Sequence, residues 1–226
     1  MSSSDTPIDP ARLEGMIDFL QSASALKDTL RTGRTASGRR ESSADHSWRL
    51  CLLAMLLADD LEGVDLVRLL QLCLVHDLAE ALTGDVPAPC QTAADGRKER
   101  EREALRELCA PLPDDLRQRI EALCAEYDAG ASPESLMAKG LDKIETMLQH
   151  LAGANPPGFD YRFNLTYGRP ITDRHPVLRQ MRSSLDSKMR RRIEAGSADG
   201  DASQGPSTSE AGAGDPPSAE LTKTIT

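Results

Sequence analysis

The chain has 226 residues, which is enough for one well-buried domain with appendages and too short for two large domains. Hydrophobic residues make up 39% of the chain and aromatic residues only 3%, so aliphatic side chains must build the core, which favours packed helices over a β-sandwich. The net charge of −9 has the wrong sign for a general nucleic-acid or anionic-membrane binder, so neither partner is expected.

The termini differ in composition from the rest of the chain. Residues 1–8 are predicted to be disordered, and residues 195–226 form a low-complexity acidic tail that lacks the apolar side chains needed to offset its ordering entropy. The folded domain is therefore expected at residues 9–194.

Apolar residues recur at helical spacing through most of this domain, which predicts a single all-α bundle. Pro10 opens a first helix that is expected to reach Leu30. A polar, glycine-punctuated loop over residues 31–45 follows. The second helix is expected from Ser47 to Asp60, and the third from Asp65 to about Leu82, where Thr-Gly stops it.

The second half of the domain is also predicted to be helical. A charge-rich helix is expected from Arg97 to Leu108, and a fifth helix from Asp115 to Tyr127. Ser132 has the features of an N-cap before a sixth helix that runs to about Leu151. Residues 153–170 are predicted to be irregular, and a final helix begins near His175.

The apolar runs and the cysteines indicate in which cellular compartment the protein is expected. The longest apolar run is too short to cross a bilayer, and the first residues do not form a secretory signal, so a cytoplasmic location is expected. The five cysteines include no C-x-x-C pair, which is evidence against a disulfide framework. Four of them lie among aliphatic residues and are predicted to be free core thiols: Cys51, Cys73, Cys109 and Cys124.

Histidine and carboxylate residues gather at two junctions of the predicted helices. His46 follows an aspartate before the second helix, and the adjacent His76 and Asp77 lie late in the third. A divalent cation takes imidazole nitrogen and carboxylate oxygen from different elements, and Asp142, in an otherwise apolar helix, can supply a further carboxylate. The alternatives are an ordinary polar pair at the helix end and a surface ion pair between Asp142 and a neighbouring lysine.

Two further acids lie close to His76 in the sequence. Glu80 follows it by one helical turn, and Asp85 lies just past the predicted helix end. Acids beside a metal site can orient and deprotonate an attacking water, as hydrolases require.

Three segments of the chain, residues 41–49, 74–89 and 138–145, resemble the motif regions of the HD-domain metal-dependent phosphohydrolases, and within them the 5′-deoxynucleotidase group. The resemblance extends from about Leu13 to Ile193. It implies four metal ligands: His46, His76, Asp77 and Asp142. It also implies that Glu80 positions or activates the water. Asp85 corresponds to an acid near the deoxyribose, and Glu80, Asp85 and the Val86 carbonyl correspond to the holders of an additional ion in some members.

The resemblance also implies an arginine on the substrate phosphate, for which Arg31 is the candidate. Relatives usually carry a tryptophan shortly after this arginine, whereas this chain has Arg34. Arg34 is therefore a candidate contact to the sugar, and a weaker preference for deoxyribose over ribose is expected. Clustering of Arg31 and Arg34 with Arg39 and Arg40 predicts a local cationic site for an anionic substrate.

The leading hypothesis is a metal-dependent phosphomonoesterase that converts deoxyribonucleoside 5′-monophosphates to deoxynucleosides and phosphate. The alternatives are an HD phosphohydrolase that acts on another nucleotide phosphoester, and a catalytically idle helical module that binds a protein partner. The expected cofactor is a divalent cation, Mn, Co, Fe, Zn or, less readily, Mg. The resemblance implies a homodimer, for which the apolar face of the first or last helix can serve.

Overall fold

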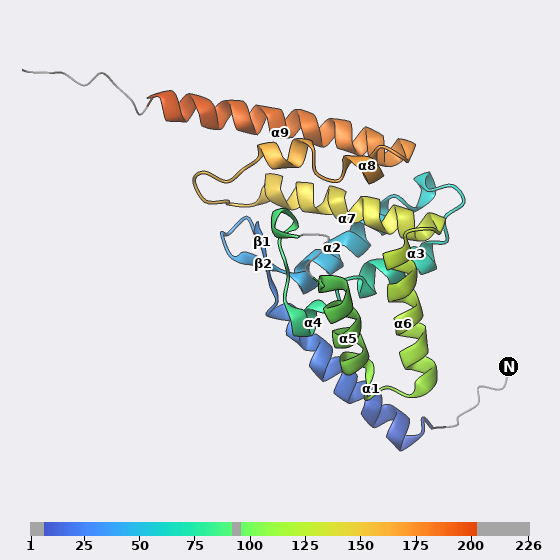
Figure 1. Ribbon diagram of the computed structural model, residues 1–226. Coiled ribbons are helices and arrows are strands. Elements are labelled where there is room, and N and C mark those ends of the chain that lie inside the picture. The colour runs from blue at the N-terminus through green and yellow to red at the C-terminus, as the bar shows by residue number, and fades with distance from the viewer. Residues whose placement is uncertain (1–6, 92–95, 203–226) are drawn as a thin grey trace, which may run out of the picture.

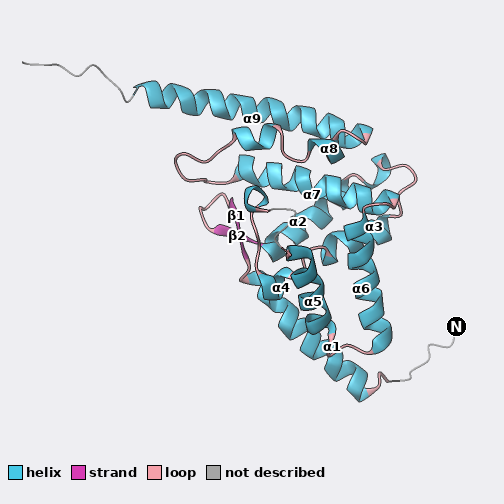
Figure 2. Ribbon diagram, in the orientation of Figure 1, coloured by secondary structure: helices cyan, strands magenta, loops and turns pink. Residues whose placement is uncertain are grey.

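Helix α7 (Pro133–Ala152) is the centre of the fold in a computed structural model that describes residues 7–91 and 96–202 (Figure 1). Five other helices contact it: α2 (Ser43–Leu56), α3 (Leu66–Val75), α6 (Asp114–Ala129), α8 (Arg169–Thr172) and α9 (Pro176–Ala202). Leu141, Ile144 and Met147 on α7 are fully buried and interlock with the leucines of α2 and α3. The all-α prediction is confirmed, with one small hairpin as the exception (Figure 2).

The first two helices have different bounds from those predicted. Helix α1 (Pro10–Ala23) ends early and continues as a single 3-10 turn over Ser24–Lys27. Helix α2 begins at Ser43, before the predicted start, because Ser42 and Asp45 form a reciprocal capping box. His46 therefore lies inside α2 and is buried, whereas the sequence suggested a position before the helix.

The predicted loop over residues 31–45 contains a β-hairpin. Strand β1 (Leu30–Arg34) pairs antiparallel with β2 (Arg40–Ser42). The Arg40 guanidinium strengthens the pairing, because it donates to the backbone carbonyls of Arg31 and Leu30 at 2.9 and 2.8 Å. The polar composition concealed this short strand pair, in which long-range contacts outweigh local propensity.

The predicted third helix is two separate pieces. Helix α3 ends at Val75, and the short helix α4 begins only at Glu80 and ends at Thr83. Between them the backbone bonds are of the tighter i to i+3 type, and the His76 side chain donates from Nδ1 to the Cys73 carbonyl at 2.9 Å. The argument that Glu80 lies one turn along a continuous helix from His76 is therefore wrong.

The remaining helices are close to the prediction. Helix α5 (Arg97–Cys109), α6 and α7 occupy the expected segments, and Ser132 caps α7 by accepting from the Ser135 amide at 3.1 Å. No helix in the described ranges is both long enough and apolar enough to span a membrane. Cys73 and Cys109 are buried, and Cys51 and Cys124 are half-buried.

Helix α9 starts at Pro176, as predicted, and continues to Ala202, beyond the expected domain boundary at residue 194. The other residues predicted to be disordered, 1–6 and 203–226, lie outside the described ranges. Helix α9 lies directly against α7 at Gly140, where an added Cβ would be 2.2 Å from Leu178 Cδ1. Any larger residue at position 140 would displace the buried Leu178 side chain.

A buried arginine on α9 organises the irregular segment between α7 and α9. Arg182 is 1% exposed and donates to the backbone carbonyls of Asn164, at 2.6 Å, and Tyr167. It also donates to Asp186 at 2.9 Å. This network fixes Tyr167, whose side chain faces the cavity described below.

We expect Arg182→Met to destabilise the domain by about 2–4 kcal/mol, because it leaves the carbonyls of Asn164 and Tyr167 without this donor and leaves Asp186 paired with Arg169 alone. Urea unfolding followed by circular dichroism measures the loss. Arg179→Met, at an exposed position on the same helix, is the control and should stay within about 0.5 kcal/mol of the wild type. Equal stability of the two variants would contradict a structural role for Arg182.

Candidate active site

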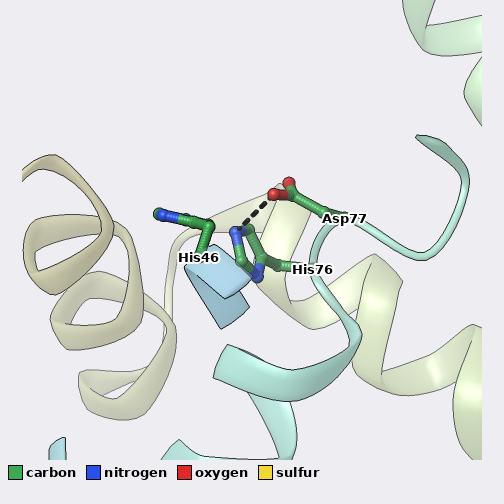
Figure 3. Close-up of side chains that lie close together, drawn as sticks. All are labelled: His46, His76 and Asp77. Atoms are coloured by element: carbon green, nitrogen blue, oxygen red, sulfur yellow. Dashed lines mark ion pairs between the residues drawn. The ribbon is translucent and has the colours of Figure 1, made fainter. Parts of the chain in front are cut away.

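The four predicted metal ligands come from three elements and lie together. His46 is in α2, His76 caps the end of α3 with Asp77 next to it, and Asp142 is on α7. The Nε2 atom of His46 lies 3.2 Å from Asp142 Oδ1, and the Nε2 atom of His76 lies 3.1 Å from Asp77 Oδ2. Figure 3 shows the two imidazoles and Asp77, and one atom from each of these three residues falls within 4.8 Å of the others.

The imidazole nitrogens fit a metal ion. The Nε2 atoms of His46 and His76 are both buried and make no hydrogen bond in the described part of the chain. The Nδ1 atom of His76 must carry the proton, because it bonds to a carbonyl, so its Nε2 presents a lone pair. Two such nitrogens beside two carboxylates form a donor set for a divalent cation.

Glu145 is a supporting residue that sequence reasoning did not single out. Its carboxylate pairs with Nδ1 of the buried His46 and accepts from Arg49 Nε at 2.7 Å. A carboxylate on the far nitrogen orients a metal-binding imidazole and raises its basicity. The signal was available, because Glu145 follows Asp142 by three residues and so lies on the same face of the helix.

Asp142 is buried. The alternative in which it forms a surface ion pair with a lysine is therefore wrong. Its Oδ2 atom accepts from Lys143 Nζ at 2.8 Å and from the Tyr127 hydroxyl at 3.3 Å. Burial opposes the charge on this carboxyl, but Lys143 and His46 hold the pKa of Asp142 well below its usual range. The group is therefore an anionic carboxylate ready to bind a cation.

Glu80 reaches the site from the start of α4 and is oriented by α2. The hydroxyl of Ser43, which is fully buried, donates to Glu80 Oε2 at 2.7 Å. Burial, together with the Asp77 carboxylate, raises the pKa of Glu80 to about 8. The negative charge on this carboxyl is therefore disfavoured beside Asp77, and a bound cation would favour its carboxylate form.

A cavity of about 440 Å³ opens beside these residues. Its walls include His76, Asp77, Glu80, Asp85, Val86, Asp142, Lys143 and Arg31. Arg31, on β1, donates from Nη1 to Asp77 Oδ2 at 3.1 Å and lies 4.0 Å from Asp85 Oδ1. Burial opposes its charge, but Asp77, Asp142 and Asp85 raise the pKa of Arg31 further above its ordinary value. Arg31 is therefore a permanent cation at the wall of the cavity.

The other arginines of the hairpin do not line the cavity. Arg34 donates to the Gly38 carbonyl at 2.8 Å within the hairpin turn. Arg39 pairs with Asp45, and Arg40 bonds to the backbone of β1. The structure brings only Arg31 of the predicted cationic cluster to the site, and it does not place Arg34 where a sugar contact was expected.

The HD domain family profile matches residues 23–181. The chain belongs to the HD domain family. The 5′-deoxynucleotidase HDDC2 of Mus musculus is 31% identical over 191 residues, which cover 82% of this chain and 94% of the mouse protein. The protein of the same name from Homo sapiens is 35% identical over 136 residues, covering 59% of this chain and 66% of the human protein.

Two solved structures of similar proteins share the fold of this chain. A Magnetospirillum magnetotacticum protein, described as a predicted metal-dependent phosphohydrolase, is 28% identical with a TM-score of 0.68, over 80% of this chain and 97% of that chain. The PH0347 protein of Pyrococcus horikoshii is 26% identical with a TM-score of 0.58, over 77% of this chain and 99% of that chain. The HD-domain chain thus shares its architecture with a protein described as a predicted metal-dependent phosphohydrolase.

Proposed function

We propose that this HD-domain protein is a metal-dependent phosphomonoesterase that hydrolyses deoxyribonucleoside 5′-monophosphates. The observation that carries the proposal is the pair of buried, unbonded imidazole nitrogens beside Asp77 and Asp142, at the wall of a cavity that also presents Arg31. The names of the curated relatives, 5′-deoxynucleotidases, support the substrate class. A cavity of about 440 Å³ is in the usual range of small-ligand sites.

His46, His76, Asp77 and Asp142 hold the ion in this proposal. A bound divalent ion supplies Lewis-acid chemistry, which withdraws electron density from the phosphate and makes water easier to deprotonate. Arg31 binds non-bridging phosphate oxygens and orients the phosphate group.

Glu80 is the proposed water-handling acid. Its carboxylate orients the attacking water and accepts a proton from it, while the Ser43 hydroxyl holds the carboxylate in place.

Asp85 is proposed to face the deoxyribose. It lines the cavity next to Arg31, and burial raises the pKa of its carboxyl. An additional ion, held by Glu80, Asp85 and the Val86 carbonyl, is a second arrangement for the same residues. Arg34 has no part in the proposed substrate site, because its guanidinium bonds within the hairpin.

The identity of the ion is proposed from its ligands. Imidazole favours transition metals, and two imidazoles with two carboxylates suit Mn, Co, Fe or Zn better than Mg, which prefers oxygen ligands and water.

The test is a phosphate-release panel of deoxy- and ribonucleoside 5′-monophosphates, run after chelation and with each divalent metal added back. The expected result is metal-dependent release with deoxyribonucleotides as the better substrates. Release only from cyclic nucleotides or nucleoside triphosphates would favour a different HD phosphohydrolase. No release from any nucleotide with any metal would favour the catalytically idle module.

Ser43→Ala tests how Glu80 is positioned. Loss of one hydrogen bond worth about 1–1.5 kcal/mol predicts that kcat falls about 5- to 10-fold, with metal content unchanged. Ser47→Ala is a matched control, since Ser47 is buried one turn further along α2 and its hydroxyl has no hydrogen-bond partner among the described residues. An equal loss in both variants would point to a general effect on α2 instead.

The homodimer is proposed to form through α2 and α3. The two helices lie side by side, since Cys51 Sγ of α2 is 3.9 Å from the Leu70 carbonyl of α3. Their outer faces expose large apolar side chains, namely Trp48, Leu52, Met55, Leu56, Val67 and Leu74. Exposed apolar side chains gathered on two neighbouring helices favour an interaction surface, and two copies related by a two-fold axis can cover it mutually. Light scattering should give twice the monomer mass for the wild type and a monomer for Trp48→Glu, whereas a monomeric wild type would contradict the proposal.

The cytoplasm is the proposed compartment. Cys73 and Cys109 are free thiols packed in the core, and burial raises the pKa of both thiols, so they stay protonated and unreactive. Buried thiols of this kind are typical of proteins from a reducing environment.

A further inference from the structure

We propose that Lys143 is a second phosphate-binding cation, in the same cavity as Arg31, and that the two cations select a terminal phosphate group over a phosphodiester. The inference rests on the proposed function and deepens it. It concerns how the substrate phosphate is bound, and it names the class of phosphoester that this site accepts.

Each of the two cations pairs with one carboxylate of the ligand cluster. Lys143 Nζ lies 2.8 Å from Asp142 Oδ2, and the other oxygen of Asp142 is 3.2 Å from His46 Nε2. Arg31 Nη1 lies 3.1 Å from Asp77 Oδ2, the same oxygen that is 3.1 Å from His76 Nε2. Both carboxylates of the proposed donor set therefore have a cation beside them, and both cations line the cavity. A phosphate bound in this cavity can meet a positive group from each.

Lys143 is open to the cavity although it pairs with Asp142. Its side chain keeps 30% of its surface exposed, against 8% for Asp142, and it lines the same cavity as Arg31. An ammonium group has three donors, so the bonds of Lys143 to Asp142 and to the Tyr167 side chain leave one donor for a ligand.

The surrounding chain holds Lys143 in position. Its Nζ atom lies 5.1 Å from the centre of the Tyr167 ring, a cation–π contact. Gly168 then passes so close that an added Cβ would be 2.7 Å from Lys143 Cβ, at a backbone φ of +69° that favours glycine. Arg182 donates a hydrogen bond to the Tyr167 carbonyl and so holds the Tyr167 backbone in place. A lysine immobilised in this way loses little further freedom when it binds an anion.

The number of cations matches one class of phosphoester. A terminal phosphate has three non-bridging oxygens and close to two negative charges near neutral pH, whereas a phosphodiester has two such oxygens and one charge. A divalent ion, Arg31 and Lys143 together offer one positive partner for each oxygen of the terminal group. A diester leaves one cation without an anionic oxygen, so it gains less from this site.

Lys139 provides the matched control. It lies one turn before Lys143 on α7 and also lines the cavity, but its Nζ atom lies 4.6 Å from the Tyr127 ring centre. Among the described residues Lys139 forms no ion pair with a proposed ligand, whereas Lys143 pairs directly with Asp142. The two lysines thus share helix, charge and cavity and differ in their distance from the metal centre.

The experiment measures the binding of inorganic phosphate to the full-length, manganese-loaded protein by calorimetry. We expect Lys143→Met to weaken phosphate binding at least about 10-fold, Lys143→Arg to recover most of it, and Lys139→Met to stay within about 2-fold. Metal content, measured by elemental analysis, should be the same in all four proteins. The preference in kcat/KM for p-nitrophenyl phosphate over bis-p-nitrophenyl phosphate should fall in Lys143→Met.

Two results would overturn the inference. One is wild-type phosphate affinity in Lys143→Met. The other is loss of metal from Lys143→Met with no recovery in Lys143→Arg, which would make Lys143 only a counter-ion for Asp142. A wrong substrate proposal would give a different result from either of these. The wild type would then bind phosphate through Lys143 and yet release no phosphate from deoxynucleotides.

Discussion

His76→Ala is expected to remove the divalent ion and abolish phosphate release. The variant deletes one of the two buried Nε2 atoms of the proposed site, both without a hydrogen-bond partner among the described residues, and the remaining His46 and carboxylates form an incomplete donor set. Hydrolysis should fall to the background of the assay, since the chemistry at the phosphate depends on the ion. Helix content by circular dichroism should be nearly unchanged. The melting temperature should fall by the amount that metal binding contributes.

His175→Ala is the control for this substitution. His175 lies at the start of α9, half-buried and outside the cavity, so it should retain both metal and activity. Stoichiometric metal with wild-type turnover in His76→Ala would remove the site assignment. Loss of metal in both variants would indicate a general destabilisation.

Glu80→Gln is expected to keep the metal and lower kcat by about 10²–10⁴-fold, the usual effect of losing a general base. The amide has nearly the same shape and can still accept from the Ser43 hydroxyl, so the fold and the nucleotide affinity should persist. Single-turnover kinetics would place the loss in the chemical step. The metal content of the variant decides between two roles, because loss of an ion together with activity would make Glu80 a ligand of the additional ion.

Glu145→Gln is a useful comparison for Glu80→Gln. Glu145 is another acid next to a proposed metal ligand, but its carboxylate contacts the far nitrogen of His46 and does not line the cavity. A role through His46 predicts weaker metal binding, about 10- to 100-fold, with kcat restored when the metal is in excess. Opposite outcomes for the two glutamates would separate the proton-handling acid from the residue that orients a ligand.

The sequence alone determined those features that depend on neighbouring residues. Helical spacing, the Ser132 N-cap and the Pro176 start are local signals, and they predicted α5, α6, α7 and α9 closely. The His-Asp pair and its flanking motif also lie within a few residues of one another, so the family resemblance could be recognised before any contact was known.

The tertiary structure decided which polar residues meet. The Ser43 bond to Glu80 joins residues 37 positions apart, and the His46 pairing with Glu145 spans 99 positions. No periodicity encodes such contacts, because they depend on how whole helices pack. The same reason explains why Arg34, a candidate by its place in the loop, bonds within its own hairpin, while Lys143, which resembled half of a surface pair, faces the cavity. Local spacing shows which face of a helix a side chain occupies, and only packing shows what that face meets.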